Sequence, residues 1–68
     1  MIIKTQDGDC FIRTEAIVSI ELRTGNCIYA YSANGKEILL GKYDKLRAEK
    51  ILGEIISCTE SKFNMPKE

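Results

Sequence analysis

Residues 39–55 read LLGKYDKLRAEKILGEI, and the spacing of the apolar side chains changes within this stretch. Up to Tyr43 the apolar residues follow the two-residue period of a strand, and after Asp44 they follow the period of an amphipathic helix. Asp44 suits the helix N-cap, where a carboxylate accepts hydrogen bonds from backbone amides that have no helical acceptor. The stretch therefore predicts a strand followed by a C-terminal helix that frays near residues 59–62. The buried stripe of this helix is expected to contain Ala48, Ile51, Leu52, Ile55, Ile56 and Thr59.

The segments before this stretch alternate between apolar and polar residues, as strands do. Such alternation covers residues 17–23, 27–33 and 36–43, and two shorter strands flank Asp7-Gly8. Short turn signals separate these segments, which favours antiparallel neighbours. We expect an α+β fold in one domain over residues 1–68, an antiparallel meander of about five strands packed against one C-terminal helix. The expected packed face of the sheet consists of Val18, Ile20, Leu22, Ile28, Ala30, Ile38 and Leu40.

A chain of 68 residues forms a small core, which seldom supplies more than roughly 3–5 kcal/mol of stability without help. The three cysteines are odd in number and lack redox or metal spacing, so we expect reduced thiols. The absence of histidine disfavours a structural zinc site. Since disulfides and zinc are disfavoured, self-association is the expected additional source of stability. The polar tail from about residue 61 either docks on the domain through Phe63 or frays.

Charge and hydropathy limit the classes of partner. The ten basic and ten acidic side chains cancel, which disfavours sequence-independent nucleic-acid binding, because such binding uses Lys and Arg to neutralise phosphates. No apolar run approaches the ~20 residues of a membrane span, and the N-terminus lacks the long apolar run of a signal peptide. We therefore expect a cytoplasmic protein that does not enter membranes.

The residue types give little support for catalysis. Without histidine the commonest general acid or base is missing, and no cysteine is marked by a neighbouring base that would activate it. Asp7-Gly8-Asp9 indicates a turn, because an EF-hand loop needs twelve residues and a terminal glutamate. The glycines form no phosphate-binding loop. The sequence therefore indicates a protein that is not an enzyme and that requires no cofactor or metal.

Aromatic side chains gather on the second face of the expected sheet. The candidate interface consists of Tyr29, Tyr31, Leu39 and Tyr43. Three interpretations are open. These residues are ordinary strand formers, since tyrosine favours strands; they form a protein interface; or they form a platform on which nucleic-acid bases stack.

Basic side chains cluster around the expected start of the helix, and Lys42, Lys45 and Arg47 are candidate anion-binding residues. Lys45 and Arg47 lie where the helix dipole favours negative charge, so an anion or an acidic partner would relieve an unfavourable arrangement. The alternative is a solvated polar face that Asp44 and Glu49 neutralise. Separately, the first or last strand of the meander has an edge that could pair with its symmetry mate in a two-fold dimer.

Four segments together resemble a group of small uncharacterised proteins from Gram-positive bacteria and their prophages. The segments are IIKTQDG (2–8), AIVSIEL (16–22), IYAYSANGKEILLGKY (28–43) and AEKILGEI (48–55). The resemblance depends mainly on hydrophobic alternation and on Leu40-Gly41-x-Tyr43. It implies a β-meander with a C-terminal helix, and it assigns no activity and no functional residue.

The function expected from the sequence is a non-enzymatic protein-interaction module that self-associates through the aromatic sheet face or through an edge strand. The alternative is a small nucleic-acid-binding accessory or regulatory protein. That alternative would use Tyr29, Tyr31, Arg23, Lys36 and Lys42.

Overall fold

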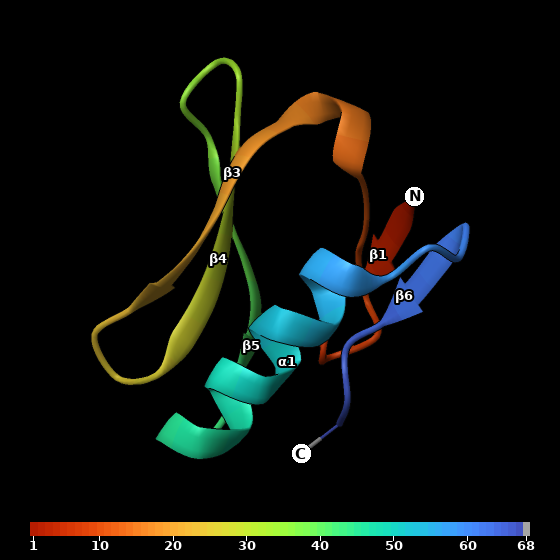
Figure 1. The fold of residues 1–68 in the computed structure, drawn as a ribbon. Helices are drawn as coiled ribbons and strands as arrows, with labels where there is room; N and C mark the ends of the chain where they lie inside the picture. The colour runs from red at the N-terminus through yellow and green to blue at the C-terminus, as the bar shows by residue number, and fades with distance from the viewer. Residues whose placement is uncertain (68) are drawn as a thin grey trace.

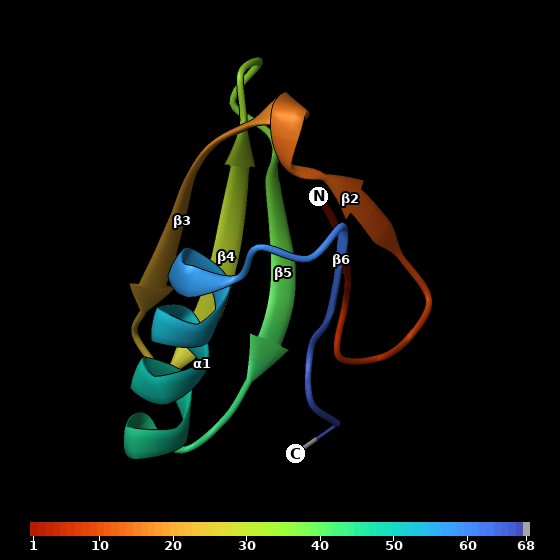
Figure 2. The ribbon, with the colours of Figure 1, turned by 45° about the vertical axis from the view of Figure 1, so that its right-hand side comes forward.

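The computed structural model describes residues 1–67, which form two small sheets and one α-helix (Figure 1). In chain order the elements are β1 (Ile2–Lys4), β2 (Phe11–Arg13), the 3-10 turn η1 (Thr14–Ala16), β3 (Ile17–Arg23), β4 (Cys27–Ser32), β5 (Glu37–Lys42), α1 (Lys45–Ser57) and β6 (Lys62–Asn64). β3, β4 and β5 form an antiparallel meander, and α1 lies across one face of it (Figure 2). The predicted α+β fold is therefore confirmed.

The first two strands do not extend this meander. β1 pairs antiparallel with β2 and parallel with β6, so these three strands form a separate sheet in the order β2-β1-β6. The turn η1 follows β2 directly and redirects the chain before β3 begins (Figure 1). The tail is thus docked: Phe63 in β6 is half-buried, and Met65 just beyond it is only 4% exposed.

Val18 differs from the packed face that alternation predicted. The register between β3 and β4 shifts between Ile17 and Ser19, which places a β-bulge at Val18. A bulge adds one residue to a strand and so breaks the two-residue alternation. Val18 is consequently 70% exposed, and its assignment to the packed face is wrong.

The helix begins as predicted and ends slightly earlier. The backbone amide of Arg47 donates to Asp44 Oδ1 at 2.9 Å, which confirms Asp44 as the N-cap. Ile56 is 82% exposed, however, so its assignment to the buried stripe is wrong. Ile55 faces the core, and Ile56, about 100° further around the axis, lies on the flank of the helix.

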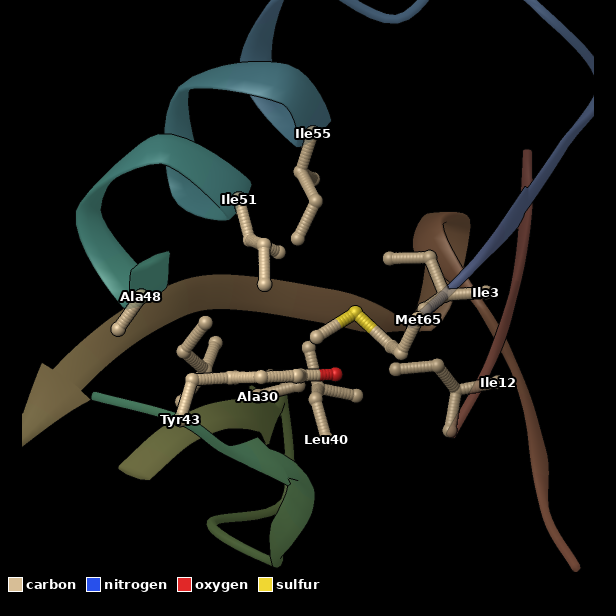
Figure 3. Close-up of a cluster of buried hydrophobic side chains, with 10 residues drawn as sticks. Ile3, Ile12, Ala30, Leu40, Tyr43, Ala48, Ile51, Ile55 and Met65 are labelled. Atoms are coloured by element: carbon tan, nitrogen blue, oxygen red, sulfur yellow. The ribbon is translucent and has the colours of Figure 1, made fainter. Parts of the chain in front are cut away.

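The core lies where the helix and the two sheets meet (Figure 3). It contains Ile3, Ile12, Ile28, Ala30, Leu40, Tyr43, Ala48, Ile51, Ile55 and Met65. Figure 3 shows Met65 among side chains from both sheets, with Ile3 and Ile12 on one side and Leu40 on the other. A residue near the C-terminus therefore joins the two sheets into one hydrophobic core.

Candidate functional site

The outer face of the β3–β4–β5 sheet, on the side away from α1, contains three of the four candidate interface residues. Tyr29 lies opposite Leu39 in the ladder, and Tyr31 lies opposite Glu37. Residues directly opposite in an antiparallel pair point to the same face. The two tyrosine rings are 6.5 Å apart at their centroids and tilted by 36°. The structure thus brings Tyr29, Tyr31 and Leu39 together.

Arg23 covers this aromatic pair. Its guanidinium carbon lies 5.1 Å from the ring centroid of Tyr29 and 5.9 Å from that of Tyr31, within the range of cation–π attraction. The same guanidinium donates to the Tyr31 hydroxyl and lies 3.4 Å from the Glu37 carboxylate. The hydrogen bond to Tyr31, followed by the attraction of Glu37, raises the pKa of Arg23. On the outer face, the aromatic rings and the Glu37 carboxylate therefore already have a partner, Arg23, within one chain.

Tyr43 does not lie on this face, so the candidate interface does not include it. It is only 7% exposed and belongs to the core. Its hydroxyl donates to the Pro66 carbonyl at 2.5 Å, and its ring lies so close to Gly41 that a Cβ there would come within 2.7 Å of it. Burial raises the pKa of the Tyr43 phenol, against a smaller opposing effect of Arg47. The Leu40-Gly41-x-Tyr43 pattern is thus a packing motif.

Only two of the three candidate anion-binding residues lie together in the structure. Lys42 and Arg47 line a cavity of about 600 Å³ together with Gln6, Tyr43 and Asp44. Lys45 is not among the lining residues, and the Asp44 carboxylate in the same wall caps the helix. A carboxylate beside the two basic groups lowers the affinity of this hollow for an anion.

Gln6 closes the edge of β5 next to this cavity. Its backbone amide donates to the Leu40 carbonyl at 2.8 Å, and its side-chain oxygen accepts from the Lys42 amide at 2.8 Å. Its side-chain nitrogen donates to the carbonyls of Lys42 and Lys67 at 3.2 and 3.0 Å. Gln6 therefore pairs with backbone groups of Leu40 and Lys42 at this edge and also binds the C-terminal tail.

The edge of β3 is different. β3 is the seven-residue strand at the other end of the sheet, and within residues 1–67 no strand pairs with its outer edge. Its inward-facing residues Ile17, Ile20 and Leu22 are only half-buried, whereas Ile28 of β4 and Leu40 of β5 are buried. The cover over the core is therefore thinner on the β3 side.

The side of α1 that faces the β3 edge carries apolar residues that the rest of the chain covers only partly. Leu52 is half-buried and Ile56, one helical turn later, is exposed. Arg47 lines the cavity beside Gln6 at the β5 edge, so its flank of the helix faces β5. Ile56 follows nine residues later and, at about 100° per residue, lies on the opposite flank, toward β3. We call the β3 edge, Leu52 and Ile56 the open margin.

Sequence reasoning assigned Ile20, Leu22, Leu52 and Ile56 to the core and did not recognise the open margin. The helical segment carried no signal for it, because an apolar stripe can include adjacent residues, as Ile51 and Leu52 show. The bulge at Val18 had no signal either, because nothing in the alternation of residues 17–23 marks it.

The structure gives little support for a disulfide, a metal site or a membrane span. All three cysteines are free, with Cys10 exposed and the other two half-buried. Residues 1–67 contain no cluster of three or more Cys, Asp or Glu side chains that could hold a metal ion. Over the same residues, no helix is long and apolar enough to cross a membrane.

Comparisons of the chain with protein-family models, with curated proteins and with solved structures find no match. The function is therefore inferred from the geometry of these surfaces.

Proposed function

We propose that this chain is a non-enzymatic protein-interaction module that self-associates, with a second copy of the chain as its partner. The observation that supports this most directly is the uneven cover over one core. Ile28 and Leu40 are buried by their own chain, while Ile20 and Leu22 in the neighbouring strand are half-buried beside the exposed Ile56. Removing such apolar area from water contributes about 25 cal/mol per Å², and a small domain benefits from this contribution.

The charge balance supports a second copy as the partner. Ten basic and ten acidic side chains give a net charge of zero, so two copies do not repel each other through a net charge at neutral pH. The outer face with Tyr29, Tyr31 and Leu39 is a second surface for protein contact. Because Arg23 already covers its two rings, we assign it less weight than the open margin.

Sedimentation equilibrium tests this proposal over concentrations from micromolar to millimolar. We expect a dimer whose fraction rises with concentration, together with a melting temperature that rises with concentration, because association stabilises only the folded chain. A chain that stays monomeric over the whole range, with a constant melting temperature, would contradict the proposal.

Nucleic-acid binding is the competing function. It would use the two tyrosine rings as stacking surfaces, but a base must first displace the Arg23 guanidinium from them. Titration with a mixed oligonucleotide pool at low salt measures this directly. Salt-sensitive binding by a chain that stays monomeric would favour the competing function over self-association.

The same proposal places the module in the cytoplasm. Its three free cysteines, one of them exposed, suit a reducing compartment in which thiols do not form disulfides. Mass spectrometry of the protein isolated under native conditions should find three unmodified thiols. A recovered disulfide-linked form would count against this location.

A further inference from the structure

We propose that β3 of one copy pairs antiparallel with β3 of a second copy about a two-fold axis at Ile20. The two three-stranded sheets then become one six-stranded sheet, and the two α1 helices lie side by side on it. This inference rests on the self-association proposed above and names the surface that mediates it. The open margin is its physical basis, because there an unpaired strand edge and poorly covered apolar side chains occur together.

The backbone of β3 offers the longest open edge in the described chain. β2 and β6, the outer strands of the other sheet, have three residues each, whereas β3 has seven. Gln6 already bonds the edge of β5. An open edge presents a row of N–H and C=O groups that a second strand can satisfy. Antiparallel pairing of β3 with its copy provides that second strand.

Side-chain charges favour Ile20 as the centre. Directly opposed residues share a face, so the inward-facing Ile20 meets Ile20 of the second copy, and Glu21 meets Ser19. A centre at Glu21 would oppose two carboxylates, which destabilises a cross-strand pair. A centre at Leu22 would draw the turn after Arg23 into the ladder, against Ile20. The register at Ile20 opposes no like charges, and its central pairs, residues 19–21, lie beyond the bulge at Val18.

The spacing of the helices agrees with this pairing. α1 contacts both β3 and β4 and so lies over the gap between them. If paired strands are about 4.8 Å apart, the two helix axes come to lie about 10 Å apart, which is close to the 8–10 Å of packed helices. Leu52 and Ile56 project into the space between the helices. The two-fold axis therefore buries the residues that the single chain leaves exposed.

The directions of β3 and α1 decide which parts of the two helices meet. β3 descends while α1 rises (Figure 2), and a two-fold axis at the sheet edge makes the two helices antiparallel. Because α1 begins below the end of β3 and its last turn lies at the level of that strand (Figure 2), the C-terminal halves of the two helices, with Leu52 and Ile56, are the parts that come together.

Two matched substitutions on α1 test the surface. Ile56→Lys places a charge in the proposed interface, and Leu46→Lys places the same charge at an equally exposed position, 79% against 82%, on the side of the helix away from the sheet. We expect Ile56→Lys to raise the dimer dissociation constant about tenfold or more, and Leu46→Lys to leave it unchanged. Equal effects of both substitutions, or no effect of Ile56→Lys, would overturn the proposed surface.

Disulfide formation tests the register. In a background with Cys10→Ser, Cys27→Ser and Cys58→Ser, the variants Ser19→Cys and Glu21→Cys are oxidised with diamide, separately and mixed. A centre at Ile20 predicts a cross-linked dimer in the mixture only, since opposed Cβ atoms are about 5 Å apart. A dimeric protein that cross-links in one variant alone, or in neither case, would overturn this inference but not self-association. A strictly monomeric natural chain would overturn both.

Discussion

The two edges of the β3–β4–β5 sheet are finished in different ways. At the β5 edge, Gln6 bonds the strand, Tyr43 lies against Gly41, and Met65 fills the core behind them. At the β3 edge the strand has no neighbour within residues 1–67, and the exposed Ile56 projects beside it. One sheet therefore has a closed edge and an open edge.

The difference between the edges reflects where the terminal segments of a short chain pack. Both the segment after β1 and the C-terminal tail lie at the β5 side (Figure 2), where Gln6 bonds Leu40 and Lys42 of β5 and the Lys67 carbonyl of the tail. With 68 residues, little chain is left to cover the other side. A substitution at the closed edge should therefore change the stability of the single chain, and one at the open edge should change its association.

Truncating Met65, which packs behind the closed edge, should have the largest effect on the free energy of unfolding. Met65→Ala leaves a cavity between the two sheets, and we expect a loss of about 2–5 kcal/mol in the free energy of unfolding. Urea denaturation at low protein concentration measures it. The control Leu46→Ala alters an exposed helical position and should change stability by less than about 0.5 kcal/mol. Similar values for the two variants would mean that the tail is not part of the core.

Gly41→Ala tests the close contact at the same edge. The new Cβ would lie 2.7 Å from Tyr43 Cε2, so the ring must move, and we expect a loss of about 1–3 kcal/mol. At Gly53 in α1 the added Cβ meets open space, and Gly53→Ala should stabilise the helix by roughly 1 kcal/mol. A second measurement, the double variant Gly41→Ala with Tyr43→Ala, should cost less than the sum of the two single changes. Strict additivity would contradict the steric explanation.

Tyr43→Phe should have a smaller effect, which depends on pH. At neutral pH the lost hydrogen bond to the Pro66 carbonyl should cost about 1 kcal/mol. Because burial raises the pKa of this phenol in the folded chain, Tyr43 contributes stability below its unfolded pKa and loses it as pH rises through the folded value. The variant should therefore lose less stability than the natural chain above about pH 10. Tyr29→Phe is the control, and an identical alkaline profile for both variants would count against this interpretation.

Much of the closed edge could be predicted from residues near one another in the sequence. The change of period around Asp44 located the end of the sheet, the N-cap and the helix. These features depend on local backbone preferences, which a short segment carries in its own residues.

The features that the sequence did not predict depend on contacts between distant segments. The burial of Tyr43 requires the Pro66 carbonyl, and the separate sheet requires β6 to pair with β1 from the other end of the chain. The exposure of Ile56 depends on which flank of α1 the other elements cover, which periodicity within the helix does not encode. Tyr29, Tyr31 and Leu39 are therefore neighbours, as the alternation indicated, whereas Tyr43 is in the core, and an interface on this face stays a prediction.

The open edge should give the smallest change in the stability of the single chain. Ile56→Gln exchanges an exposed side chain, so the free energy of unfolding at low concentration should change by less than about 0.5 kcal/mol. The rise of melting temperature with concentration should nevertheless weaken, because association no longer buries this side chain. Calorimetry of both proteins over a range of concentrations measures the two effects separately. A loss above about 1 kcal/mol at the lowest concentration would mean that Ile56 packs within its own chain, and the contrast between the two edges would then disappear.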